Sequence, residues 1–217
     1  MADHKNVKDS MAKNRFHEYI LPVITFCVIS AVIGVLLAVV NALTAPVIAE
    51  RQKAEAAALM RELMPDTTEL EVLDLTEAQT AILDENRLTP MDYYVATLKD
   101  NDKGYAMILE VPGYGDNIRL LVAARPAEKA DDGLVLCGIR ILAHSETPEL
   151  GSKITHPNFY EQFNGVRLNQ RLVLSGQDKS AGDVKTIDAI VSATVSSRAV
   201  VTAVQAAVDV FNLEEAR

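Results

Sequence analysis

The pattern of apolar and polar residues divides the chain into one long apolar segment and a longer part built of short alternating runs. No charged residue occurs between Glu18 and Glu50, and the most apolar stretch, Ile20–Val40, reads ILPVITFCVISAVIGVLLAVV. A helix that crosses the hydrocarbon core of a bilayer needs about 20 apolar residues. The pattern therefore predicts a transmembrane helix over residues 19–42.

A cleaved signal peptide is the alternative for this segment. The apolar region of a signal peptide is typically about 7–15 residues long and is followed by a small-x-small cleavage site. The run here is longer, and Leu43 with Ala45 makes a poor cleavage site. A retained anchor is the prediction. Basic residues stand on both sides of it, so the positive-inside bias favours a cytoplasmic N-terminus, residues 1–18, only slightly.

A break and a second helix are predicted after the apolar segment. Asn41–Pro46 reads as the break, with the proline starting the new helix, because proline lacks the N–H that a helix interior needs. Residues 47–64 are rich in Ala, Glu, Leu and Arg, which are strong helix formers. We expect a helical stalk over residues 43–65 that leads from the membrane to a domain over residues 66–217.

Short apolar runs separated by polar loops predict a sheet in that domain. The runs contain β-branched and aromatic residues, and the loops are rich in Asp, Asn and Gly, as in hairpins. Strands joined by short loops form a largely antiparallel sheet. The four predicted strands are Tyr93–Leu98, Tyr105–Val111, Asn117–Ala124 and Leu134–Leu142, with Asp131, Asp132 and Gly133 in the last loop.

Two helices and another strand are predicted after the sheet. Residues 156–163 suggest a short helix and Arg171–Leu174 a strand. From Ser196 to Phe211, apolar residues recur at helical spacing, which predicts a helix with one apolar face. The fold class is α+β, with one N-terminal transmembrane helix followed by a mostly antiparallel sheet and flanking helices.

Charge and cysteine content narrow the range of partners. The formal net charge is −9, and the excess of acidic residues follows residue 18. An acidic domain disfavours nucleic acid and anionic lipid as partners. Cys27 lies in the apolar run, so pairing with Cys137 is implausible, and neither cysteine has metal-binding spacing. We predict no disulfide and no metal site.

Three segments carry residues that could hold a ligand. The first, Asp188–Ser197, reads DAIVSATVSS and leads into the predicted C-terminal helix. Ser196 or Ser197 is most simply an N-cap of that helix. The N-terminus of a helix also offers unpaired N–H groups to anions, so a phosphate on the Thr194 hydroxyl would lie near such donors.

The other two segments are turns. His144–Lys153, HSETPELGSK, follows a strand that Pro148 cannot continue, and Pro112–Gly115, PGYG, joins two predicted strands. Glycine in a turn allows the backbone to approach a flat ligand closely. Taken alone, each segment is more simply an ordinary turn. No nucleophile–base pair or glycine-rich nucleotide loop occurs, so we predict no independent catalytic site, although a bound cofactor could supply chemistry.

Taken together, the three segments resemble the FMN-binding domain shared by the RnfG subunit of Rnf electron-transport complexes and the NqrC subunit of the sodium-pumping NADH:quinone reductase. The flavinylation signature of this family is Asp-x-x-Ser/Thr-Gly-Ala-Thr. The chain keeps Asp188, Ala193 and Thr194 at this spacing. Val191 and Ser192 stand where the family has Ser/Thr and Gly.

A second family element, Glu-Thr-Pro-Gly-Leu-Gly, resembles residues 146–151, where Glu149 replaces the first glycine. The Gly113-Tyr114 turn before the Ile118–Val122 strand also matches the family. The segment NALTAPVIAERQ at residues 41–52 and the length of 217 residues resemble RnfG more than the longer NqrC. An NqrC-like subunit and a redox-inactive anchored scaffold remain the alternatives.

The resemblance implies that a separate flavin transferase, with FAD as donor, links FMN by a phosphoester to Thr194. It implies a single-pass protein of the bacterial inner membrane whose periplasmic domain carries electrons among the other Rnf membrane subunits, in a complex that links ferredoxin and NAD to ion movement. Asp188 is assigned to recognition by the transferase or to the local turn. The implied phosphate-side residues are Ser192, Ala193, Val195, Ser196 and Ser197, and the implied ring-side residues are Tyr114, Glu146, Thr147, Leu150 and Gly151.

Overall fold

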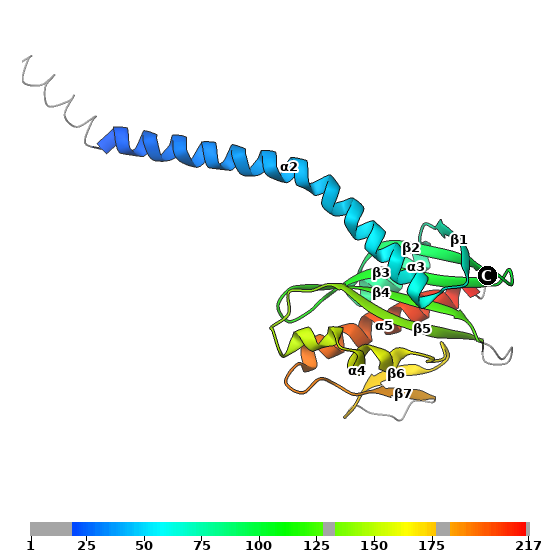
Figure 1. The fold of residues 1–217 in the computed structure, drawn as a ribbon. Helices are drawn as coiled ribbons and strands as arrows, with labels where there is room; N and C mark the ends of the chain where they lie inside the picture. Colours follow the sequence, from blue (N-terminus) through cyan, green and yellow to red (C-terminus); the bar gives the residue numbers. More distant parts are fainter. Residues whose placement is uncertain (1–18, 128–132, 177–182, 216–217) are drawn as a thin grey trace, which may run out of the picture. The chain divides into compact units, whose positions relative to one another are not determined.

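The computed structural model describes residues 19–127, 133–176 and 183–215. The chain forms two compact units, Met1–Ala54 and Glu55–Arg217, which are described separately (Figure 1). The compact C-terminal unit thus starts before the domain boundary expected at residue 66. Some residues used in the sequence analysis lie outside the described residues: the basic residues that precede the apolar segment, Lys5, Lys8, Lys13 and Arg15, and the loop residues Asp131 and Asp132.

Helix α2 runs from Leu21 to Leu63 without interruption. Its part Leu21–Ile48 has 28 residues, and its most apolar 18-residue window has a mean hydropathy of 3.0, so it is long and apolar enough to cross a membrane. The predicted break at Asn41–Pro46 is wrong, because the helix continues through Pro46. Proline removes one backbone hydrogen bond, which a long helix on both sides tolerates, as membrane helices often do.

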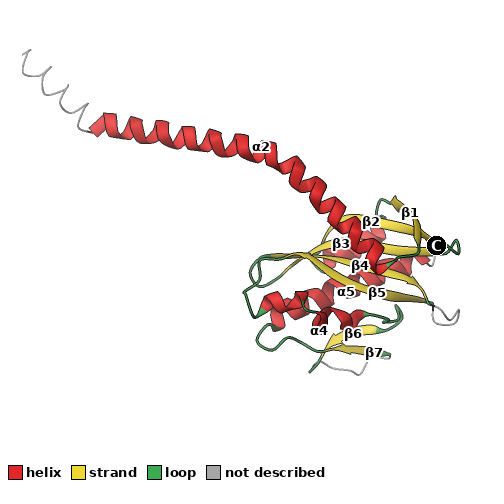
Figure 2. Cartoon of the chain, in the orientation of Figure 1, coloured by secondary structure: helices red, strands yellow, loops and turns green. Residues whose placement is uncertain are grey.

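A five-stranded antiparallel sheet, with its strands in chain order, is the centre of the C-terminal unit (Figure 2). The four predicted strands are confirmed, and β1 adds a fifth at the edge. Between β1 and β2 lies α3, Glu77–Glu85, which Thr76 and Gln79 cap reciprocally. The strands are β1 Thr67–Val72, β2 Thr89–Leu98, β3 Lys103–Pro112, β4 Asn117–Pro126 and β5 Leu134–Ala143.

The chain after β5 forms short helices, a two-stranded parallel sheet and the long helix α5. The predicted short helix at 156–163 is present as an α-helical turn followed by a 3₁₀ turn, and the predicted strand Arg171–Leu174 is confirmed. The C-terminal helix begins at Thr194 rather than at Ser196, and its described part extends to Glu215. The elements are η3 Gly151–Thr155, α4 Pro157–Tyr160, η4 Glu161–Phe163, β6 Arg171–Leu174, β7 Val184–Ile187 and α5 Thr194–Glu215.

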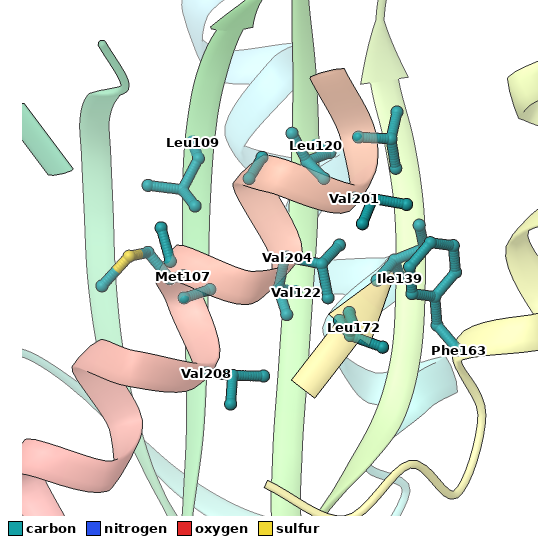
Figure 3. Packing of buried hydrophobic residues seen from close by; sticks show 14 of the residues in the cluster. Met107, Leu109, Leu120, Val122, Ile139, Phe163, Leu172, Val201, Val204 and Val208 are labelled. Atoms are coloured by element: carbon teal, nitrogen blue, oxygen red, sulfur yellow. The ribbon is translucent and has the colours of Figure 1, made fainter. Parts of the chain in front are cut away.

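Helix α5 covers one face of the sheet (Figure 3). Val201, Val204 and Val208 of α5 pack against side chains of the central strands, such as Met107 and Val122. Met107 and Val122 lie opposite each other on β3 and β4, and the residues next to each of them along its strand point to the other face of the sheet. The large core under α5 fixes the position of its N-terminal turn relative to the sheet.

The opposite face of the sheet is also buried. Ile108 and Leu121 of the central strands form a second apolar cluster with Ala56, Met60 and Met64. The last turns of α2 therefore belong to the core of the C-terminal unit. Burial on both faces explains why β3 and β4 read as nearly continuous apolar runs rather than as alternating ones.

Candidate functional site

A pocket of about 540 Å³ lies where three segments distant in sequence meet. These segments are the turn between β3 and β4, the loop between β5 and η3, and the entry to α5. Ten of the eleven residues implied by the family resemblance line the pocket, and Ser197 does not. The lining residues are Tyr114, Glu146, Thr147, Leu150, Gly151, Ser192, Ala193, Thr194, Val195 and Ser196.

The carboxylate of Glu146 joins all three segments. The side chain is only 6% exposed. Its Oε1 accepts hydrogen bonds from the Tyr114 N–H at 2.7 Å and the Gly115 N–H at 3.3 Å. Its Oε2 accepts a 2.6 Å hydrogen bond from the Ser196 hydroxyl. The backbone N–H of Glu146 donates to His144 Nδ1 at 3.2 Å, which also holds the start of this loop.

Two glycines make room for this carboxylate. A Cβ atom at Gly113 would collide with Glu146 Oε1 and would lie 2.7 Å from the Asp116 carbonyl. A Cβ atom at Gly151 would collide with Glu146 Oε2 and would lie 2.9 Å from the Ser196 Oγ. Glycine is therefore required at both positions because the Glu146 carboxylate lies against the backbone there. This packing contact alone explains the two glycines.

The entry to α5 differs from the N-cap that the sequence suggested. Ser196 and Ser197 lie inside the first turn, so the prediction that either caps the helix is wrong. The Ser197 N–H and hydroxyl both donate to the Ala193 carbonyl at 3.0 Å, while the Ser197 Oγ accepts from the Ile190 N–H at 3.0 Å. Ser197 is fully buried and holds the turn that precedes the helix. The side-chain contact to the turn before the helix therefore comes from a residue inside the first turn, and not from a residue that precedes the helix.

The arrangement leaves anion-binding groups at the pocket. Thr194, Val195 and Ser196 are the first three residues of α5, so their N–H groups have no carbonyl one turn earlier to bond. Thr194 is exposed and lines the pocket. An anion on the Thr194 hydroxyl would be attached at the positive end of the α5 dipole.

Exposed apolar side chains surround the same pocket. Tyr114 is 72% exposed, Val195 52% and Leu150 41%. Large exposed apolar groups that gather at one place are typical of a ligand or partner site. The pocket therefore combines apolar side chains with helix N–H donors, as a flat apolar ring carrying a phosphate requires.

The two glycine positions of the family pattern that this chain changes are both left-handed. The backbone φ angle is +66° at Ser192 and +60° at Glu149. Only glycine adopts this region without steric cost. The left-handed backbone conformation thus explains why the family pattern has glycine at these two positions. This chain keeps the same conformation with Ser192 and Glu149.

Asp188 lies outside the pocket lining. Its side chain is exposed, and its backbone is held by Gln162 on both sides: the Asp188 N–H donates to Gln162 Oε1 at 2.7 Å, and the Asp188 carbonyl accepts from Gln162 Nε2 at 3.3 Å. The structure also adds Gly115 to the site, because its N–H binds Glu146. The sequence pointed to the turn that contains Gly115, but the family resemblance did not include this residue among the site residues. Its signal in the sequence was the Gly-x-Gly spacing around Tyr114.

Known proteins place the domain in one class. The family model described as "FMN-binding domain" matches residues 113–209, which contain all three segments of the pocket. The crystal structure of Shewanella oneidensis NqrC is 25% identical and aligns with 58% of this chain and 62% of that one, at a TM-score of 0.44. The pocket and the family model thus define a protein with an FMN-binding domain.

Relatives that cover nearly the whole chain identify the family. The G subunit of the ion-translocating oxidoreductase complex of Shewanella baltica is 35% identical over 191 residues, 84% of each chain. The G subunit of the proton-translocating ferredoxin:NAD(+) oxidoreductase complex of Clostridium ljungdahlii is 30% identical over 200 residues, 92% of this chain and 95% of that one. The chain belongs to the family of G subunits of ion-translocating oxidoreductase complexes, the RnfG family.

Proposed function

We propose that the chain is an electron-carrying subunit of an Rnf-type ion-translocating ferredoxin:NAD oxidoreductase complex and holds FMN through a phosphoester to Thr194. The observation that carries this proposal is the position of Thr194, an exposed hydroxyl at the first residue of α5 in the wall of the pocket. The names of the RnfG-family relatives supply the type of complex. Bound FMN supplies the electron transfer, and the protein supplies the attachment and the position.

The residues at the pocket fit such a cofactor. The N–H groups of Thr194, Val195 and Ser196 suit the phosphate. The exposed side chains of Tyr114 and Leu150 offer apolar surface to a flavin ring. A pocket of about 540 Å³ falls within the range of roughly 300–1,000 Å³ typical of cofactor sites.

The attachment reaction needs a flavin transferase and FAD. The bond that forms joins Thr194 Oγ1 to the phosphorus on the riboflavin side of the FAD pyrophosphate. The bond that breaks is the pyrophosphate P–O bond, so AMP leaves and the hydroxyl proton is released. No oxidant or reductant is consumed. Because Thr194 is exposed, the folded domain presents its hydroxyl to another protein.

The proposed topology has a cytoplasmic N-terminus, Leu21–Ile48 across the inner membrane and the C-terminal unit in the periplasm. Its support is the apolar part of α2 and the family's placement of the flavin domain. Alkaline phosphatase fused after Arg217 should be active, since this enzyme folds only outside the cytoplasm. An inactive fusion, together with an active cytoplasmic reporter at the same point, would reverse the orientation.

Substitution of the acceptor hydroxyl tests the attachment. Thr194→Val keeps the side-chain shape and removes the hydroxyl, and Ser192→Ala removes the other exposed hydroxyl of this loop. With a flavin transferase co-expressed, flavin fluorescence in a denaturing gel should disappear from the Thr194→Val chain and persist in the Ser192→Ala chain. Undiminished fluorescence of the Thr194→Val chain would exclude Thr194 as the acceptor.

A further inference from the structure

Glu146 is the only charged residue that is buried in the part of the chain that the structure describes. Burial of a carboxylate is unfavourable unless hydrogen bonds compensate for the lost water. The hydrogen bonds to Glu146 come from Tyr114 and Ser196, which line the proposed flavin pocket, and from Gly115, the neighbour of Tyr114 in the same turn. A group that is costly to bury and whose partners all belong to one site has a role in that site.

The three hydrogen bonds connect the two ends of the pocket. The N–H groups of Tyr114 and Gly115 belong to the turn with the exposed aromatic ring, on one side of the carboxylate. The Ser196 hydroxyl belongs to the first turn of α5, two residues after Thr194. Glu146 therefore sets the distance between the ring-side turn and the phosphate-side helix.

We propose that Glu146 is a positioning residue that holds the pocket in its flavin-ready shape before any flavin is attached. The inference rests on the proposed function, because it concerns the same pocket. It adds that Glu146, which the family resemblance placed around the ring, acts through Tyr114, Gly115 and Ser196 rather than on the ring, since each of its oxygens already accepts a hydrogen bond from the protein. Pre-formation lowers the ordering cost when a ligand enters.

The surroundings of Glu146 support a fixed brace. Gly113 and Gly151 leave no space between their backbones and the carboxylate, so the side chain has no room for another position. The Ser196 hydroxyl donates its proton to Glu146 Oε2 and is not available as a donor to a phosphate. Phosphate recognition at this residue then falls to its N–H group.

Hydrogen–deuterium exchange of the unmodified full-length chain in detergent tests this role of Glu146 without flavin. The brace is the set of hydrogen bonds from Tyr114, Gly115 and Ser196 to the Glu146 carboxylate. In Glu146→Ala, the amides of Tyr114 and Gly115 should exchange at least tenfold faster, and that of Ser197, which forms the first hydrogen bond of α5, should also become faster. Glu146→Gln keeps an oxygen acceptor for the two N–H groups and should stay within about threefold of the wild type. Glu71→Ala removes an exposed carboxylate on β1 and should change neither region.

A double variant excludes a general loss of stability. Ser196→Ala removes one donor, and if the brace is one unit, Glu146→Ala/Ser196→Ala should change the Ser197 exchange rate no more than Glu146→Ala alone. If the accelerations of Ser197 exchange in the two single variants multiply in the double variant, the proposal is overturned. Unchanged exchange at Tyr114 and Gly115 in Glu146→Ala would also overturn it. If Glu146→Ala does not fold, failure of Glu146→Gln to retain protection overturns it instead.

The attachment reaction gives an independent readout. With limiting flavin transferase and FAD, Glu146→Ala should gain flavin at least tenfold more slowly than the wild type, and Glu146→Gln should restore most of the rate. If the wild type also gains no flavin, the proposed function is rejected. The hydrogen-exchange rates would still show whether Glu146 holds the Tyr114 turn and the start of α5 together. Full-speed attachment to Glu146→Ala would show that the pocket does not need Glu146.

Discussion

The Ser196 hydroxyl donates a 2.6 Å hydrogen bond to Glu146 Oε2 across 50 positions of sequence. The bond joins the first turn of α5 to the loop after β5, and both groups are buried. Charge-assisted hydrogen bonds of this length are stronger than neutral ones. The site is therefore assembled by tertiary contacts, and not only by the short motif that contains Thr194.

Glycine at the two left-handed positions should stabilise the domain. In this region a residue other than glycine destabilises the folded state by roughly 1–2 kcal/mol through steric strain. Glycine avoids the strain but loses more conformational entropy on folding, which destabilises the folded state by roughly 0.5–1 kcal/mol. Ser192→Gly and Glu149→Gly should each raise the free energy of unfolding by about 0.5–1 kcal/mol, measured by urea unfolding in detergent. Ser145→Gly, at a position with ordinary φ, should lower it. A decrease in all three variants would contradict the strain at Ser192 and Glu149.

Asp188→Asn should impair attachment of flavin without changing the attached flavin. The carboxylate lies outside the pocket, and beside a phosphate it would be unfavourable by roughly 4 kcal/mol at 4 Å with an effective dielectric constant of about 20. The flavinylated fraction should fall when the transferase is limiting, as intact mass shows. The spectrum and midpoint potential of the modified pool should stay the same.

The control for Asp188 is Asp74→Asn, which neutralises an exposed carboxylate outside the loop and should leave the flavinylated fraction unchanged. Complete modification of Asp188→Asn at limiting transferase, together with a large shift in midpoint potential, would instead place Asp188 in the redox site.

Met64→Ala should destabilise the C-terminal unit by roughly 2–4 kcal/mol, because a buried methionine replaced by alanine leaves a cavity. Met64 is 1% exposed in the cluster on the second face of the sheet. Met91→Ala is the matched control at 44% exposure and should change stability by less than about 0.5 kcal/mol. A loss of stability for Met64→Ala as small as that expected for Met91→Ala would show that the residue directly after α2 is not part of this core.

Cys137 should react slowly with alkylating reagents. Burial raises the pKa of its thiol to about 11, because the thiolate is the charged form and loses its hydration. Relative to an ordinary thiol near 9, about 100-fold less thiolate is present at pH 8. In a Cys27→Ala background, alkylation should be slow in the folded protein, accelerate up to pH 11 and become ordinary in urea. Rapid labelling of the folded protein at pH 8 would contradict this burial.

Much of the fold could be predicted from the sequence because its central strands and α5 carry strong apolar patterns. Other elements gave weaker signals. The strand β1 reads TTELEV, an edge strand whose polar residues face water, and α3 depends on a capping box, Thr76 with Gln79, that the apolar pattern does not show. The continuity of α2 through Pro46 could not be predicted, because it depends on the helix on both sides outweighing one lost hydrogen bond.

The candidate site could be predicted as three segments but not as a geometry. The motif around Thr194 and the loop at residues 146–151 resemble a known pattern, so their residues were identified. The direction of the Glu146 carboxylate follows from how the sheet and α5 pack, which no local pattern contains. The role of Ser197 could not be predicted either, because its hydroxyl bonds the Ala193 carbonyl and the Ile190 N–H of the turn before α5 instead of capping the helix from outside.

Peptide mass mapping of the chain, purified from cells that contain a flavin transferase, tests the covalent attachment of FMN most directly. The peptide that contains Thr194 should carry the mass of FMN less one water, and fragmentation should place the adduct on Thr194 rather than on Ser192, Ser196 or Ser197. The control is a known substrate of the flavin transferase, expressed in the same cells. If that substrate carries FMN and this chain shows no added mass, covalent attachment is contradicted. An adduct on another residue would contradict Thr194 as the acceptor.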